Sequence, residues 1–162
     1  MDSVPPRIHT LIENYARGPE ILRSTLEMFP ADKLAIPLPP GSWSALQVVC
    51  HLSDFELVYA DRIKAVIAED GPALPARDEN RYASRLQYER RNTWDELSLI
   101  EAVRRQVTPL LRSLGPAEFR RVGVHSLDGP LSLETLLERI AGHIPHHVQF
   151  IERKQQLLLK PA

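Results

Sequence analysis

Three histidines have the residue type and the spacing to hold one metal ion. His143 and His147 are four residues apart, and residues i and i+4 lie one above the other on the same face of a helix. His51 lies far upstream, in the apolar run from Val48 to Leu52. In both segments the apolar residues recur at helical spacing, and the histidines belong to the same stripe. We therefore expect three inward-facing imidazoles, carried by two helices, to meet in the interior.

The alternative interpretation is that these histidines are ordinary core residues. A single histidine on an apolar face is more often hydrogen-bonded than metal-bound, and an isolated pair at i and i+4 is a weak motif. The combination is more informative, because several buried imidazoles without partners are costly and one metal ion satisfies them together. The two stripes that contain them are Leu136, Ile140, His143, His147 and Phe150, and Ser44, Val48, His51, Phe55 and Val58.

Four amphipathic helices are expected to position these residues. Helical periodicity covers residues 6–29, 44–70, 93–114 and 133–159. The segment 71–92 has no sustained periodicity, and we expect it to form a long ordered crossing or a lid. The sequence therefore predicts an all-α fold, a four-helix bundle in one domain over residues 1–162, with a long loop between its second and third helices.

Local signals predict where three of the helices begin. Ser44 with Gln47, and Thr93 with Glu96, match the capping-box pattern at the start of the second and third helices. Ser132 is in place to cap the fourth helix.

Prolines inside the helical segments predict irregularities. Gly18-Pro19 is expected to kink or break the first helix, Pro109 to bend the third and Pro145 to kink the fourth. The segment 119–131 reads as a connector in which Gly123 and Asp128-Gly129-Pro130 predict turns.

Composition limits the partners and the compartment. The chain has 162 residues, 43% of them apolar, which is enough for one sizeable core. A net charge of -1 with both signs mixed gives no electrostatic footprint for nucleic acid or for a membrane surface. The single Cys50 excludes an intrachain disulfide, and residues 1–6 lack the basic and apolar blocks of a signal peptide. We therefore expect a cytoplasmic protein with neither a membrane nor a nucleic-acid partner.

Several of these motifs, taken in order, resemble a known family. The elements are Gly41-Ser42-Trp43-Ser44, the run from His51 to Glu56, the loop from Asp78 to Tyr82, the turn from Asp128 to Leu131, and the run from His143 to Gln149. Their order and spacing resemble the DinB-like (YfiT-like) metal-binding bundles over nearly the whole chain. The resemblance implies that His51, His143 and His147 bind the metal, and it implies a homodimer for many members.

The resemblance narrows the chemistry without naming a substrate. Similar proteins include metal-binding members of unassigned activity, thiol S-transferases that use bacillithiol or related thiols, and mycothiol-dependent isomerases. Three imidazoles leave a divalent ion such as Zn or Ni with an open position, where a thiol or water loses its proton near neutral pH. Our first expectation is an enzyme that transfers a low-molecular-weight thiol to an electrophile. The alternatives are a metal-dependent hydrolase and a non-catalytic metal-binding bundle.

Three further residues are candidates for a catalytic role. Asp54 follows His51 by three residues, where it could accept a proton or orient a ligand; the alternative is a salt-bridge partner. Arg62 lies on the same stripe and could hold an anionic substrate group, or simply reach solvent at the bundle end. Tyr82 could close over the metal from the long loop, or pack within that loop.

The remaining candidates receive weaker expectations. Cys50 adjoins His51 but points about 100° away from it, so it is read as a small buried residue. His146 is expected at the pocket rim or on the surface, and the sequence leaves the role of His125 open.

Overall fold

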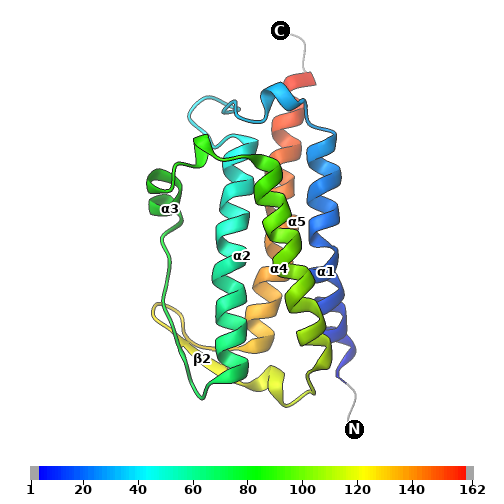
Figure 1. Cartoon of the computed structure of the whole chain (residues 1–162), viewed down its shortest axis with the longest axis vertical. Coiled ribbons are helices and arrows are strands. Elements are labelled where there is room, and N and C mark those ends of the chain that lie inside the picture. The colour runs from blue at the N-terminus through cyan, green and yellow to red at the C-terminus, as the bar shows by residue number, and fades with distance from the viewer. Residues whose placement is uncertain (1–3, 160–162) are drawn as a thin grey trace.

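Four long helices form a bundle in the computed structural model, which describes residues 4–159; the outermost residues of the expected domain, 1–3 and 160–162, lie outside that range. The helices are α1 (Pro6–Glu27), α2 (Ala45–Ala68), α4 (Thr93–Ser113) and α5 (Leu133–Leu159). In Figure 1, α1 and α5 run upward while α2 and α4 run downward. The four-helix bundle expected from the periodicity is confirmed. No helix within residues 4–159 is long and apolar enough to cross a membrane.

The segment between α2 and α4 explains why these two neighbours are parallel. It starts at the lower end of the bundle and returns along its outside to the upper end (Figure 1). The periodicity of this segment was too short to predict its elements, which are β1 (Ala73–Leu74), α3 (Glu79–Arg85) and a 3-10 turn at Tyr88–Arg90. We call residues 71–92 the crossing segment.

A small sheet closes the lower end of the bundle. β2 (Val122–His125) pairs with β1 in parallel and with β3 (Gly129–Ser132) in antiparallel register. The expected turn is present, since Gly129 has a φ of 73°, and it joins the two strands of a hairpin that the sequence did not predict. Strands of four residues are too short to give a clear alternating pattern in the sequence. Further 3-10 turns lie at Ala31–Lys33 and Glu118–Arg120.

Side chains fix the helix starts, and one predicted cap is wrong. Ser44 and Gln47 form the expected capping box of α2, and Ser132 Oγ accepts a hydrogen bond from the Thr135 amide at 3.1 Å. For α4 the cap is Asn92, whose side chain accepts from the amides of Trp94 and Asp95. Asparagine is at least as good a cap as threonine, so α4 begins one residue after it.

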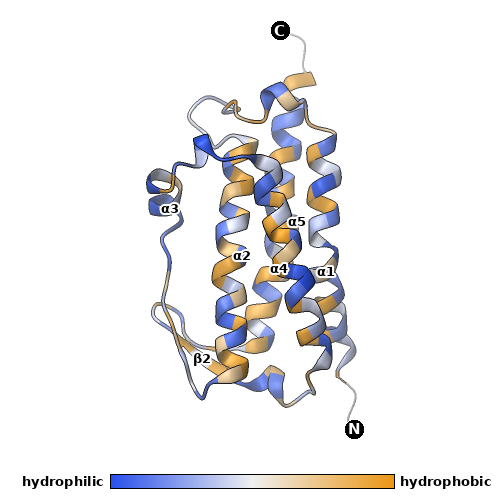
Figure 2. Cartoon of the chain, in the orientation of Figure 1, coloured by the Kyte–Doolittle hydropathy of each residue, from blue (hydrophilic) through white to orange (hydrophobic). Residues whose placement is uncertain are grey.

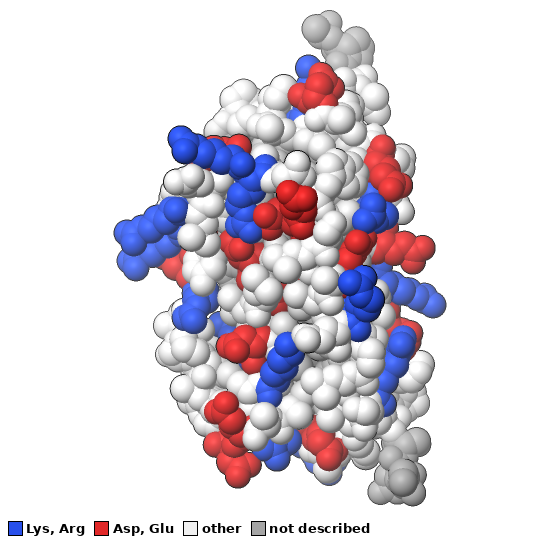
Figure 3. Space-filling model, viewed as in Figure 1, with Lys and Arg blue, Asp and Glu red and all other residues white. Residues whose placement is uncertain are grey.

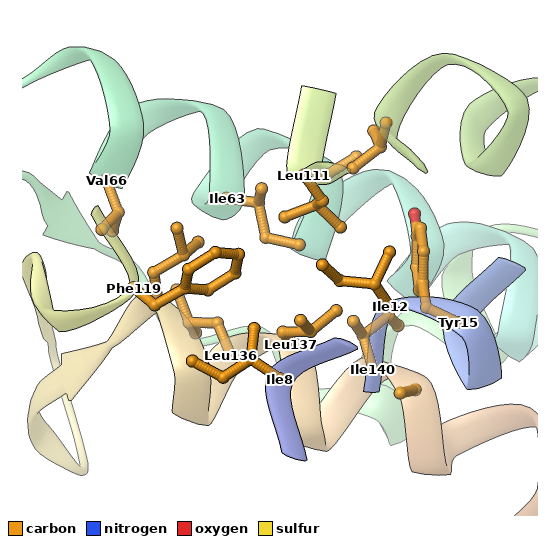
Figure 4. Packing of buried hydrophobic residues seen from close by; sticks show 14 of the residues in the cluster. Ile8, Ile12, Tyr15, Ile63, Val66, Leu111, Phe119, Leu136, Leu137 and Ile140 are labelled. Atoms are coloured by element: carbon orange, nitrogen blue, oxygen red, sulfur yellow. The ribbon is translucent and has the colours of Figure 1, made fainter. Parts of the chain in front are cut away.

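Two apolar clusters fill the bundle, and a polar layer separates them. The lower cluster includes the residues labelled in Figure 4, among them Ile12, Ile63 and Leu137. The upper cluster includes Leu22, Leu52 and Ile144. Hydrophobic and hydrophilic residues recur by turns along each long helix (Figure 2), and the buried apolar residues of the two clusters come from all four helices. Between the two clusters lie Gly18 on α1, Glu56 on α2, Arg104 on α4 and His143 on α5.

Candidate metal centre

The structure brings the three predicted histidines together. His51 comes from α2, and His143 and His147 from α5; one ring nitrogen of each lies within 4.8 Å of the other two. The Nε2 atoms of His51 and His143 are 3.0 Å apart. A tetrahedral ion with metal–nitrogen bonds of 2.0–2.1 Å separates its ligand nitrogens by about 3.3 Å. The donor set therefore fits one small divalent ion.

The electrostatics of the cluster keep its rings neutral. Burial, with a contribution from the neighbouring imidazoles, lowers the pKa of His51 to about 4 and of His143 to about 2. Burial and the neighbouring His146 lower the pKa of His147 to about 4. A neutral imidazole offers a lone pair to a cation, and a protonated one does not. At neutral pH the cluster is therefore in its ligand form.

Aromatic packing orients these rings. The ring centre of His51 lies 5.4 Å from that of Trp43 and 4.7 Å from that of Phe55. The Nδ1 atoms of His51 and His143 are buried, and no group within residues 4–159 hydrogen-bonds to them. A ligating histidine usually donates a hydrogen bond from its other ring nitrogen, and that bond fixes the direction of the ring. Here packing against the neighbouring aromatic rings sets the direction instead.

Helix α5 places its two histidines beside the core rather than at its centre. Ile144, Val148 and Ile151 are the buried residues of this part of the helix. The expectation that Phe150 lies on the inward stripe is wrong, because this residue is 37% exposed. His143 and His147 are half-buried, so the cluster lies at the margin of the core and not at its centre.

Asp54 is engaged by an arginine. Both of its carboxylate oxygens accept from Nη1 of Arg91, at 3.1 and 3.0 Å. The same guanidinium binds Glu96 at the start of α4, at 2.7 and 2.6 Å. This geometry is the salt-bridge alternative considered from the sequence. Arg91 thereby ties the end of the crossing segment to α2 and α4.

Arg62 and Tyr82 line the same cleft beside α2. Arg62 is buried, and its Nη2 donates to the carbonyl oxygen of Pro75 at 2.7 Å. The ring of Tyr82 lies 5.7 Å from that of Phe55, which itself contacts His51. His125, left open by the sequence, lies beside Arg62 with 3.2 Å between its Nε2 and Nη2 of Arg62, and it does not belong to the metal cluster.

Two other expectations concern neighbours of the ligands. Cys50 is buried as expected, and its thiol contacts the carbonyl oxygen of Tyr88 at 3.6 Å. Burial raises the pKa of Cys50 to about 12, which makes it a poor nucleophile. His146 is exposed on the flank of α5, with its ring centre 5.1 Å from that of His147.

Arg104 lies at the centre of the polar layer and was not predicted from the sequence. It is 1% exposed. Its Nε and Nη2 donate to Oε2 of Glu56 at 3.0 and 2.8 Å, and its remaining donors reach the carbonyl oxygens of Tyr15 and Ile140 at 2.7 and 3.1 Å. One side chain thus joins all four long helices. Its contact on α5, Ile140, lies about one turn before His143. A single arginine in an amphipathic helix gives no signal of such a role.

The fold and the three-histidine cluster together define a class of four-helix bundles with a candidate metal site, and comparison with known sequences identifies the family. The model of the DinB superfamily matches residues 14–151. The chain therefore belongs to the DinB superfamily, in agreement with the resemblance found in its motifs.

Curated relatives cover most of the chain. The protein named "Putative metal-dependent hydrolase OB0782" of Oceanobacillus iheyensis is 31% identical over 135 residues, 82% of this chain and 77% of that protein. "Putative metal-dependent hydrolase YfiT" of Bacillus subtilis is 28% identical over 134 residues, 82% of this chain and 75% of its own length. The names given to these relatives describe metal-dependent hydrolases.

Solved structures show the same fold. YfiT from Bacillus subtilis, described as "a probable metal-dependent hydrolase with an unusual four-helix bundle topology", has a TM-score of 0.87 at 24% identity, covering 98% of this chain and 91% of that one. The DinB-like protein YjoA of Bacillus subtilis has a TM-score of 0.61 at 15% identity, covering 94% of each chain. At these identities the likeness concerns the fold.

Proposed function

We propose that this protein is a metal-dependent enzyme that activates a small thiol for transfer to an electrophile. The observation that carries the proposal is the convergence of three neutral imidazoles, from His51, His143 and His147, on one point. An ion such as Zn or Ni held there lowers the pKa of a thiol in its open position, so that the thiolate forms near neutral pH.

The surrounding residues have separate tasks in this proposal. The three histidines hold the ion, and the rings of Trp43 and Phe55 pack against His51 and keep water from that side. Tyr82, across Phe55 from the cluster, contacts the part of the substrate that extends beyond the thiol. The half-buried side of α5 admits the electrophile.

The pairing of Asp54 favours a thiol over water as the nucleophile. Both of its carboxylate oxygens accept from Arg91, so Asp54 is not free to remove a proton from a weakly acidic nucleophile. Glu56 is paired with Arg104 through Oε2, and its Oε1 is buried without a hydrogen-bond partner among the described residues. A thiol has a pKa of about 8.5 and needs far less assistance than water to ionise.

Hydrolysis is the second candidate function. It is favoured by the names of the relatives, which describe metal-dependent hydrolases. In that case the three imidazoles would hold an ion that supplies an activated water in place of a thiolate.

Metal content of untagged protein tests the centre itself. We expect about one equivalent of a divalent ion by inductively coupled plasma mass spectrometry, and little in His143→Ala. His146→Ala is the matched control, since His146 neighbours the cluster but is exposed and outside it. Equal metal in all three proteins, or none after incubation with Zn or Ni, contradicts a metal centre.

Parallel assays then separate the two activities. The metal-loaded protein is given a small thiol with monobromobimane, and in a second reaction nitrophenyl acetate without thiol. Thiol transfer that is lost in His143→Ala and kept in His146→Ala supports the first candidate. Ester hydrolysis with the same dependence, and no thiol transfer, replaces it with the second.

A further inference from the structure

Arg62 is a buried cation without a carboxylate partner. The residue is only 5% exposed, yet no carboxylate within residues 4–159 forms an ion pair with its guanidinium. It has instead the carbonyl oxygen of Pro75, the imidazole of His125, and the ring of Tyr59 at 5.1 Å. Its Nε is buried and has no hydrogen-bond partner among the described residues. Buried charges are normally paired, so an unpaired one indicates a missing anion.

A cleft of about 230 Å³ lies over this guanidinium, between α2 and the crossing segment. Its lining consists of Leu57, Val58, Asp61, Arg62, Pro75, Arg77 and Tyr82. Arg77 is exposed and forms no ion pair within the described part of the chain, and Asp61 is the single carboxylate of the lining. The positive charge of Arg139 contributes to lowering the pKa of Arg62, but Arg139 is already paired with Asp128 at 2.6 Å. The cleft therefore carries an excess of positive charge.

The charges on the molecular surface agree with this location. In the view of Figure 3, acidic and basic side chains are interspersed, with basic ones numerous along the edge where Figure 1 places α3 and the crossing segment. An anion approaching the cleft meets these basic side chains first.

One residue of the cleft lining connects it to the histidines. The ring centre of Tyr82 lies 5.7 Å from that of Phe55, whose ring centre lies 4.7 Å from that of His51. Arg62 is eleven residues after His51, which is about 16 Å along the helix axis. Side chains on a helix lean toward its N-terminus, and since this holds for His51 as well as for Arg62, the arginine shortens that distance only by the greater length of its side chain. A ligand longer than a simple thiol is needed to reach from one to the other.

We propose that Arg62, with Arg77, binds the carboxylate of an elongated thiol substrate whose sulfur lies at the three-histidine cluster. This inference rests on the proposed thiol chemistry and adds a substrate class to it, namely thiols with a carboxylate remote from the sulfur. A carboxylate matches the fork of an arginine in geometry, and it removes the cost of the unpaired buried charge.

Thiol binding to the cobalt-loaded protein tests the proposal through the sulfur-to-cobalt charge-transfer absorption. The probes are mercaptoundecanoate and mercaptoundecanol, with mercaptopropionate and mercaptopropanol as a pair too short to span the gap. We expect mercaptoundecanoate to bind roughly tenfold more tightly than mercaptoundecanol, and the short pair to differ little. Arg77→Gln, an exposed change, should reduce the preference, and Arg62→Met should abolish it. Arg105→Gln, exposed on α4 in another groove, should leave it unchanged.

The outcomes separate the two proposals. Absorption that appears equally with both long thiols overturns the carboxylate site and leaves the thiol chemistry standing. No absorption with any thiol overturns the thiol chemistry. The site is then judged on the metal-free protein by titrating it with hexanoate and following the arginine Nε–H signals by NMR. A shift of the Arg62 signal that weakens in Arg77→Gln supports the site, and the absence of a shift overturns it.

Discussion

Gly18 on α1 provides the space that the guanidinium of Arg104 on α4 occupies. A Cβ atom at position 18 would collide with Nη1 of Arg104 and lie 3.1 Å from its Cζ. Pro19 has no amide hydrogen to donate to the carbonyl of Tyr15, and that oxygen accepts from Arg104 at 2.7 Å. The Gly-Pro pair therefore does not break α1, which is helical from Pro6 to Glu27. It forms a socket for a side chain from another helix.

Gly18→Ala should destabilise the protein. The added methyl group must displace the buried guanidinium, and we expect the free energy of unfolding to fall by about 2–3 kcal/mol. Gly142→Ala is the control, because it is also inside a long helix but a Cβ there meets nothing within 4 Å. It should stabilise the protein by about 0.5–1 kcal/mol. Urea denaturation measures both, and a Gly18→Ala variant as stable as Gly142→Ala would contradict the socket.

The buried pair of Arg104 and Glu56 should be costly to break from one side. Arg104→Met leaves the Glu56 carboxylate buried without its partner, and we expect a loss of about 3–5 kcal/mol. The double variant Arg104→Met/Glu56→Leu removes both charges and should regain most of that loss. Arg112→Ala, from an exposed pair with Glu13, should cost less than about 1 kcal/mol. If the double variant loses as much stability as Arg104→Met and Glu56→Leu lose separately in sum, the two residues act independently.

Asp54 should matter for the crossing segment more than for a proton transfer. Asp54→Asn weakens the contact with Arg91, so hydrogen exchange in residues 86–92 should become faster while the metal content stays near that of the wild type. Arg91→Met should have the same effect, because it removes the other half of the contact. If Asp54→Asn shifts the pH profile of turnover and Arg91→Met does not, Asp54 has an acid–base role of its own.

The lowered histidine pKa values set the pH dependence of the metal-free protein. His51 and His147 have a pKa of about 4 and His143 of about 2, against 6.5 for an unperturbed histidine. Below 6.5 the unfolded chain binds protons that the folded chain rejects, so acid favours unfolding. This part of the stability is present above about pH 6.5 and is lost as the pH falls toward 4. As the pH is lowered across this range, the urea midpoint of unfolding should fall less steeply in His143→Gln than in the wild type. Equal pH dependence in the two proteins would contradict the lowered pKa of His143.

The sequence predicted those features that depend on residues close together in the chain. The capping box of Ser44 and Gln47 and the helical stripe that contains His51 follow from local spacing, and both are found. The error at the start of α4 has the same local origin, because Asn92 and Thr93 are neighbouring residues that can each cap a helix. The strands of the hairpin were missed because four residues carry too little periodicity to be recognised.

The sequence by itself determined that the chain forms four amphipathic helices and that His51, His143 and His147 face inward. Side-chain direction on a helix is a matter of spacing along one segment. Only the tertiary structure decided that Arg104 enters the space at Gly18, that Arg91 engages Asp54, and that Arg62 is buried without a carboxylate. These contacts join residues distant in the chain, so they depend on how the helices and the crossing segment pack against one another, and no local pattern encodes that arrangement.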